Sequence, residues 1–314
     1  MCKGESQMKK GNLCDVAGLL VGHAQDEAAR TGCTVLFAPG GFVAGVDVRG
    51  AAPGTRETDL LQSEAMMPRV NAIVLSGGSA YGLDACSGVM RALEARGEGF
   101  QTPEARVPIV CGAVLYDLAV GSAQVRPDAA MGERALLAAT ADPVFGRVGA
   151  GTGATVGKLV PGAQARRSGI GSASVSLPGG GTVAAMVAVN ACGDIYDPET
   201  GACVACGAIE GRPVRARDAL QLRQGLAGQN TTIGVVATDV RLTKTECNRL
   251  ATVAHDGYAL AIRPTHTVSD GDTLFTVSLG EKACGAMELQ AGAVEAVWRA
   301  ILDAVRRGSE GEAC

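Results

Sequence analysis

The chain has 314 residues, of which 47% are hydrophobic and 19% charged, and its formal net charge is −4. This apolar content is sufficient for a globular core, and no basic cluster exceeds an Arg-Arg pair, which excludes the electrostatic footprint of a nucleic-acid-binding protein. The N-terminal segment has lysines without a following apolar stretch, and no apolar run approaches the roughly 20 residues that span a bilayer. We therefore expect a cytoplasmic protein with neither nucleic-acid nor membrane partners.

Glycine and cysteine content add two expectations. The 44 glycines and the scarcity of aromatic residues predict closely packed layers built from Ala, Val and Leu. The 11 cysteines are odd in number and scattered through apolar stretches, which favours reduced thiols over a disulfide framework. At this length, one large domain and two intimate domains both remain open.

The first half of the chain is predicted to alternate strands and helices. Residues 71–75 predict a buried strand, followed by a Ser-Gly-Gly-Ser turn and an amphipathic helix over 81–96. A second strand is predicted over 106–111 and a second helix over 127–140. From 145 to 181 glycine recurs every few positions, which predicts short strands and turns.

The second half is predicted to contain three buried strands, two helices and one exposed connector. The strands cover 183–190, 232–238 and 274–279, and the helices cover 244–262 and 285–307. Thr243 and Glu246 form a capping box at the start of the first of these helices. The connector, 212–230, is polar and lacks apolar periodicity, and it stops at Thr231, where a strongly β-forming run begins.

The Asn230-Thr231 junction has the features of an autoprocessing site. A threonine hydroxyl is a weak nucleophile unless a base lies within reach, and a freed α-amine, with a pKa of about 7.7–8.0, can be that base. A threonine in mid-chain can use its own amine only if the preceding bond is cut. By itself, however, Thr-Thr-Ile is also ordinary sequence for the start of a strand.

Asp270 and Asp272 form a second candidate feature, immediately before the strand predicted over 274–279. Residues at i and i+2 of an extended segment point toward the same face. The two carboxylates can therefore accept hydrogen bonds from an N-terminal ammonium or a threonine hydroxyl. Asp-Gly-Asp is also common turn chemistry, and both interpretations stay open at this point.

Two further patterns lack residues that their chemistry requires. The glycine-rich run before Lys158 is similar to a phosphate loop, but it has Thr152 at the first glycine position and Leu159 where Ser or Thr is needed. Cys203 and Cys206 have the spacing of metal ligands without a second pair. We therefore expect no metal and no cofactor.

An ordered set of motifs carries a family resemblance. The motifs are GGSAYGLDACSGVMRALEARGEGF, VPIVCGAVLYDL, GAGTGATVGKL, VAVNACGDI, NTTIGVVATDVRLTK, AHDGYALAIRP and DGDT. With them the chain resembles the DmpA-like peptidase family over about residues 12–307. That family contains L-aminopeptidase/D-esterases, β-peptidyl aminopeptidases and nylon-oligomer hydrolases.

The resemblance implies a fold and a processing event. The fold is of the α+β class, a four-layer αββα sandwich like that of N-terminal-nucleophile (Ntn) hydrolases and of the type shared with ornithine acetyltransferases. The chain 1–314 is then a single hydrolase domain, which cleaves itself into 1–230 and 231–314. Cleavage falls between Asn230 and Thr231.

Position by position, the resemblance also implies catalytic roles. Thr231 matches the nucleophile, which is Ser in the aminopeptidases and Thr in the nylon-oligomer hydrolases. Asp270 and Asp272 match the acidic or hydroxyl pair downstream of it, and two aspartates again favour the nylon-oligomer branch. Tyr81 and Asn190 match residues expected to hold the oxyanion.

Lys158 matches a lysine of the same pocket, where its ammonium steadies developing charge or keeps the neighbouring amine unprotonated. The implied activity is that of an amidohydrolase or aminopeptidase acting on small peptides or ω-amino-acid oligomers. The implied assembly is a homo-oligomer, a tetramer of processed units. Two alternatives remain: acyl transfer of the ornithine acetyltransferase type, and an inactive homologue that stays uncleaved.

Overall fold

One mixed sheet organises the computed structural model, which describes residues 11–219, 221–222 and 229–310. Its strands follow the order β10-β11-β16-β18-β2-β4-β7-β3, and β1 pairs with β2. These strands are β1 Leu20–Asp26, β2 Thr31–Val48, β3 Thr55–Arg56, β4 Val70–Ser76, β7 Val110–Val114, β10 Ile170–Ser176, β11 Thr182–Asn190, β16 Thr231–Val240 and β18 Thr273–Lys282.

Five α-helices, five short 3-10 helices and several short strands complete the described part of the chain. The helices are α1 Ala85–Ala95, α2 Ala129–Leu137, α3 Lys244–Ala254, α4 Asp256–Ala261 and α5 Ala286–Gly308. The short strands are β5 Phe100–Gln101, β6 Arg106–Val107, β8 Thr155–Val156, β9 Arg166–Arg167, β12 Asp194–Tyr196, β13 Cys203–Ala205, β14 Gly207–Ile209, β15 Arg212–Val214 and β17 Ile262–Arg263.

The long strand β2 divides the sheet into two halves. Its first part pairs with β4 and its second part with β18, and the register shifts between Phe37 and Phe42. Gly40 and Gly41 lie at this shift with φ of 74° and 72°, a region that glycine enters without steric cost. Because β2 changes direction here, the two halves can face each other.

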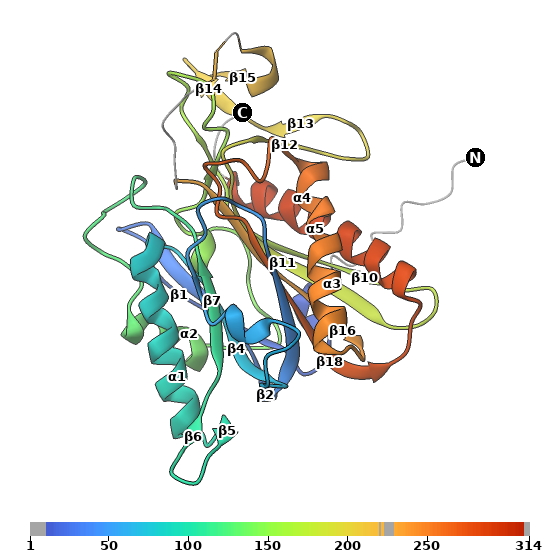
Figure 1. The fold of residues 1–314 in the computed structure, drawn as a ribbon. Helices are drawn as coiled ribbons and strands as arrows, with labels where there is room; N and C mark the ends of the chain where they lie inside the picture. The colour runs from blue at the N-terminus through green and yellow to red at the C-terminus, as the bar shows by residue number, and fades with distance from the viewer. Residues whose placement is uncertain (1–10, 220, 223–228, 311–314) are drawn as a thin grey trace.

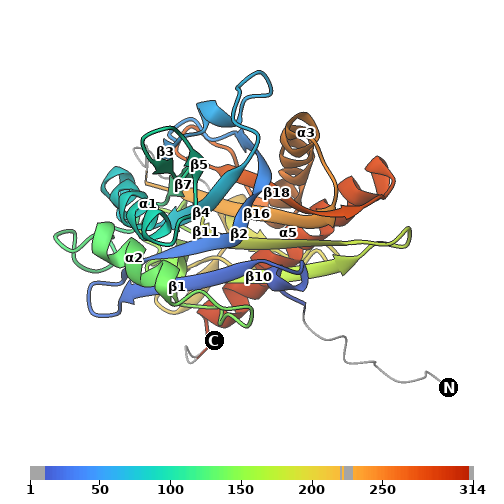
Figure 2. The same cartoon turned by 90° about the horizontal axis from the view of Figure 1, so that it is seen from below.

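The helices and the two half-sheets stack in four layers (Figures 1 and 2). Buried side chains form a separate core between each pair of neighbouring layers. Alternate strand residues, among them Leu36 and Phe275, fill a core between the two half-sheets. Val35 faces outward instead and packs with α1 and α2, whereas Val187 faces outward on the other half toward α5. The order helix, sheet, sheet, helix confirms the predicted α+β sandwich.

Local differences from the predicted elements have physical causes. The helix predicted over 81–96 is α-helical only in α1, and the residues before α1 form a 3-10 helix over Ser79–Asp84. Pro108, which lacks a backbone N–H, separates β6 from β7 where one strand was predicted. The helix predicted over 244–262 divides at His255 into α3 and α4, while the predicted capping box of Thr243 and Glu246 is present.

Neither β1 nor β2 was predicted. Within β2, Pro39-Gly40-Gly41 has the sequence of a turn, although the strand continues through it. Part of the predicted connector, residues 220 and 223–228, lies outside the described residues.

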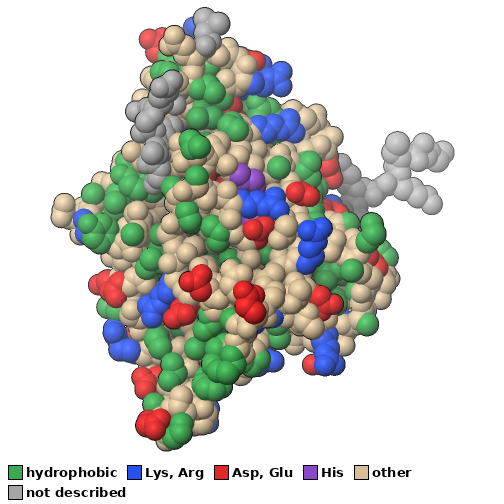
Figure 3. Space-filling model, in the orientation of Figure 1, with side chains coloured by type: hydrophobic (Ala, Val, Ile, Leu, Met, Phe, Trp, Pro, Cys, Tyr) green, Lys and Arg blue, Asp and Glu red, His purple; other side chains and the backbone are tan. Residues whose placement is uncertain are grey.

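Acidic, basic and apolar side chains are interspersed on the face shown in Figure 3. Among the described residues, no helix has both the length and the apolar character needed to cross a membrane.

Candidate active site

The Asn230-Thr231 junction lies at the ends of three neighbouring strands. Thr231 is the first residue of β16, and its antiparallel partner on β11 is Asn190, the last residue of that strand. On the other side β18 runs parallel to β16 and begins directly after Asp272. An isolated parallel bridge joins Asn230 to Asp270. The fold thus gathers five of the predicted site residues at one sheet end.

Thr231 is buried and in contact with the bond that precedes it. Its hydroxyl donates a hydrogen bond to the carbonyl oxygen of Asn230, and the Gly271 N–H donates to the same oxygen at 3.0 Å. A Cβ at position 271 would lie 2.9 Å from Thr231 Oγ1 and 2.5 Å from the Ala52 carbonyl oxygen. Only glycine therefore brings this backbone N–H so close to the junction.

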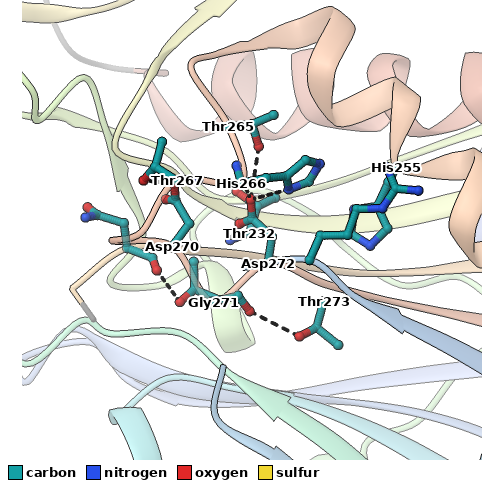
Figure 4. Close-up of polar contacts among 12 residues, drawn as sticks. Thr232, His255, Thr265, His266, Thr267, Asp270, Gly271, Asp272 and Thr273 are labelled. Carbon is teal, nitrogen blue, oxygen red and sulfur yellow. Dashed lines mark hydrogen bonds and ion pairs between the residues drawn. The ribbon is translucent and has the colours of Figure 1, made fainter. Parts of the chain in front are cut away.

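Asp272 is buried, and both of its oxygens accept hydrogen bonds (Figure 4). Oδ1 accepts from the backbone N–H of Thr232 at 2.7 Å. Oδ2 accepts from Thr265 Oγ1 at 3.0 Å, from the His266 N–H at 3.0 Å and from His266 Nδ1 at 2.9 Å. The carboxylate thereby ties Thr232, the second residue of β16, to the loop before β18.

Asp270 has a different environment on the same segment. Its Oδ2 accepts from the Thr267 N–H at 2.9 Å and from its hydroxyl, and the Cys192 thiol donates to the same oxygen at 3.4 Å. Burial raises the pKa of the Asp270 carboxyl, and the nearby charge of Asp272 raises it further. The two aspartates therefore differ in how their carboxylate oxygens are used.

Asn190 and Lys158 form a bonded pair beside Thr231. Lys158 Nζ donates to Asn190 Oδ1 at 2.8 Å and to the Asn190 carbonyl at 3.1 Å. The Thr155 N–H also donates to Oδ1, while Asn190 Nδ2 donates to the carbonyl of Tyr116 at 2.9 Å. Because a side-chain amide has two N–H groups, one of them is still available after the bond to Tyr116.

The Lys158 ammonium has an unusual acidity. Burial lowers its pKa from 10.5 to about 7, although Cys192, Asp270 and Asp117 act in the opposite direction. A lysine with a pKa near 7 exchanges protons at neutral pH, as catalytic lysines do. Its contact with Asn190, the cross-strand partner of Thr231, puts this amine at the junction.

Tyr81 differs from the other five site residues. Its side chain is 59% exposed, and the Arg126 guanidinium lies 3.8 Å from the centre of its ring. Within the described residues, none of the hydrogen bonds around the other five involves Tyr81. The structure therefore brings together Thr231, Asp270, Asp272, Asn190 and Lys158, and leaves Tyr81 in the 3-10 helix after β4.

Three residues at the site were not identified from the sequence. Asp117 is buried and accepts from the Gly78 N–H and the Thr31 hydroxyl, both at 2.7 Å, so it supports the turn that leads to Tyr81. Burial raises the pKa of the Asp117 carboxyl. Gly271 and His266 act through their position in the loop. Gly271 lies between the two predicted aspartates, which was the one available signal.

Solved structures with the same architecture define the class of fold. An L-aminopeptidase D-Ala-esterase/amidase from Ochrobactrum anthropi, described as a variant of the Ntn hydrolase fold, superposes with a TM-score of 0.70 at 22% sequence identity. The match covers 93% of this chain and 85% of that one. The fold is therefore that of the Ntn-hydrolase aminopeptidases.

Sequence comparison assigns the family. The profile of peptidase family S58 matches residues 11–312, and the chain belongs to this family. It is 43% identical over 290 residues to an "uncharacterized aminopeptidase" of Mycobacterium tuberculosis, covering 87% of this chain and 82% of the relative. It is 34% identical over 315 residues to a 6-aminohexanoate-oligomer endohydrolase of Kocuria sp., covering 93% and 85%. The protein is thus an enzyme of the peptide and amide hydrolase class.

Proposed function

We propose that this chain is the precursor of an amidohydrolase that cuts its own Asn230–Thr231 bond and then uses Thr231 as its nucleophile. The observation that carries the proposal is the contact of the Thr231 hydroxyl with the carbonyl group of Asn230, whose oxygen also accepts the Gly271 N–H. A nucleophile next to a carbonyl, with a donor already on its oxygen, is the arrangement that acyl transfer needs.

Self-cleavage proceeds in two steps. Thr231 Oγ1 attacks the Asn230 carbonyl carbon, the C–N bond breaks, and the Thr231 nitrogen leaves as an amine while an ester forms at Oγ1. Water then hydrolyses the ester, which releases chain 1–230 with a carboxylate at Asn230 and chain 231–314 with a free α-amine. The Gly271 N–H stabilises the negative charge that develops on the carbonyl oxygen in the first step.

The precursor needs a base other than the α-amine, which is still part of a peptide bond. Lys158 is the best candidate, because burial lowers its pKa to about 7 and a substantial fraction is neutral at neutral pH. Its bonds to Asn190, directly opposite Thr231, support this role.

After cleavage, the freed α-amine takes over as the base for substrate hydrolysis. Asn190 has one N–H left for the substrate oxyanion, and we propose Tyr81 for the same oxyanion on the family resemblance. Asp270 and Asp272 hold the segment around the new N-terminus. In the uncleaved chain Thr231 is only 4% exposed and Asn230 is fully buried, so departure of the Asn230 end opens the site.

We propose small peptides or ω-amino-acid oligomers as substrates, because the relatives of this chain include an aminopeptidase and a 6-aminohexanoate-oligomer endohydrolase. We further propose a cytoplasmic homo-oligomer, a tetramer of processed units. The tetramer is proposed on the family resemblance, and the cytoplasmic location on the sequence expectation given above.

One experiment tests the function. Wild type, Thr231→Ala and Thr231→Ser are incubated with aminoacyl and β-aminoacyl p-nitroanilides and with 6-aminohexanoate oligomers, with and without a free amine acceptor. We expect wild type to release amine without an acceptor, Thr231→Ser to keep part of this activity, and Thr231→Ala to lose it. Release that requires the acceptor indicates a transferase, and activity in Thr231→Ala contradicts the proposal.

A further inference from the structure

We propose that His266 is a positioning residue that locks the Asp272 carboxylate onto the nucleophile strand, and that its effect is greatest after cleavage. This inference rests on the function proposed for Thr231. It concerns a partly buried imidazole that the mechanism does not use and that is joined to β16 through Asp272 (Figure 4).

His266 supplies two of the four hydrogen bonds to the Asp272 carboxylate. Its backbone N–H and its ring Nδ1 both contact Oδ2, at 3.0 and 2.9 Å, which leaves Oδ1 to receive the Thr232 N–H. A carboxylate accepts but does not donate, so Nδ1 carries the proton of this bond. The imidazole and the backbone together fix the rotation of the carboxylate.

The backbone of His266 is held in an uncommon conformation for this purpose. Its φ is +56°, in the left-handed region that residues other than glycine seldom adopt. Such conformations persist where surrounding contacts determine them, and they gather at functional sites. Here the conformation directs both the N–H and the ring nitrogen of one residue at the same carboxylate oxygen.

The far side of the His266 ring is enclosed by other aromatic side chains. His255, at the end of α3, lies 4.9 Å away between ring centres, and Tyr258 of α4 stacks at 6.0 Å. His255 Nε2 lies 3.0 Å from the Asp47 carbonyl oxygen, so Nε2 carries its proton, and burial lowers the pKa of His255 to about 4. His266 therefore lies between the Asp272 carboxylate and the neutral imidazole of His255. On its other side, His255 contacts Asp47, which is paired with Arg49.

We expect the hydrogen bonds from His266 to Asp272 to matter more after cleavage. Before cleavage Thr231 is held from its N-terminal side, because the Asn230 carbonyl accepts the Gly271 N–H. Once the bond is cut, that anchor belongs to the other chain. The bond from Thr232 to Asp272 then becomes the side-chain anchor nearest to the new N-terminus, beside the backbone pairing of Thr231 with Asn190, and Asp272 in turn depends on His266.

The test compares variants that all tolerate a positive φ. His266→Asn keeps a donor close to the position of Nδ1, His266→Asp is nearly identical in shape but carries no donor when ionised, and His266→Gly relieves the backbone and removes the side chain. His23→Asn is the matched control, because His23 is a histidine outside this network whose Nδ1 contacts Thr34 at 2.9 Å.

Each variant is expressed as the full chain, its cleavage is followed over time, and kcat and KM are measured on cleaved protein with the best substrate of the wild type. A bond to a charged acceptor contributes enough that we expect kcat to fall about tenfold or more in His266→Gly and His266→Asp, with KM little changed. We expect His266→Asn and His23→Asn to stay within about threefold of wild type, and cleavage itself to slow less than kcat falls.

Equal kcat in His266→Asn and His266→Asp overturns the inference, and so does a wild-type kcat in His266→Gly. The comparison of Asn with Asp still decides if the glycine variant does not fold. Failure of the proposed function is separate, because it appears as an uncleaved or inactive wild type.

Discussion

Replacement of Asp270 or Asp272 by asparagine should change the free energy of unfolding by different amounts. In Asp272→Asn, the amide oxygen can accept either from Thr232 or from the three donors of Thr265 and His266, but not from both sides. The amide NH2 then faces a donor on the other side. A buried donor without an acceptor costs about 1–3 kcal/mol, and loss of the charge weakens the remaining bonds. We expect Asp272→Asn to lower the free energy of unfolding by about 2–4 kcal/mol.

Asp270→Asn serves as the matched comparison. The contacts described for Asp270 converge on Oδ2, so an amide oxygen can replace that atom while the NH2 takes the place of Oδ1. The raised pKa of Asp270 also means that the folded protein disfavours its charged form, so removal of the charge at neutral pH offsets lost bonds. We expect a change within about 1 kcal/mol.

Both variants are compared by urea unfolding in a Thr231→Ala background, in which we expect every sample to stay uncleaved. The size of the Asp270 effect depends on pH. A carboxyl whose folded pKa is raised destabilises the fold above that pKa, so the advantage of Asp270→Asn over aspartate grows as pH rises through it. Equal losses in the two variants, or a larger loss in Asp270→Asn, refute the assignment of hydrogen bonds to the two carboxylates.

Three further predictions concern cleavage. The first-order rate of self-cleavage should rise with pH around a midpoint near 7, because Lys158, with its pKa lowered to about 7, accepts a proton only when neutral. Lys158→Arg should abolish this rise. A flat pH profile in wild type excludes Lys158 as the base. Gly271→Ala should block cleavage, because its Cβ would lie 2.9 Å from Thr231 Oγ1. The control Gly285→Ala, whose Cβ would lie 3.9 Å from its nearest neighbour, should be cleaved normally on a denaturing gel. Cleavage of both variants at the wild-type rate contradicts the geometry. Thr231→Ser should still cleave, because it retains the hydroxyl, and intact Thr231→Ser on the same gel counts against a hydroxyl nucleophile.

The sequence allowed prediction of the strands and helices whose apolar periodicity is continuous. Residues 183–190 and 285–307 correspond closely to β11 and α5. Sequence periodicity did not predict β2, because Pro39-Gly40-Gly41 interrupts the apolar pattern. Pairing with both β4 and β18 keeps this strand extended in the folded protein. Periodicity describes one face of one element, and it does not report a strand shared by two half-sheets.

The site could be predicted where a motif or residue type marks it. The junction and the aspartate pair lay beside recognisable strands, and the structure brings both together with Asn190 and Lys158. His266, Asp117 and Gly271 could not be found in this way, because their contacts depend on backbone direction and on partners far apart in the chain. Nothing in the order His-Thr-Val-Ser-Asp-Gly-Asp indicates that the histidine ring meets the second aspartate.

The most direct test of the central claim is N-terminal sequencing of the purified wild-type protein, together with the intact masses of its fragments. We expect one new N-terminus, beginning Thr231-Thr232-Ile233, and a companion fragment that ends at Asn230, with masses that sum to the precursor plus one water. Thr231→Ala should give the uncut chain. An intact wild-type chain, or a cut at another bond that persists in Thr231→Ala, would contradict the account.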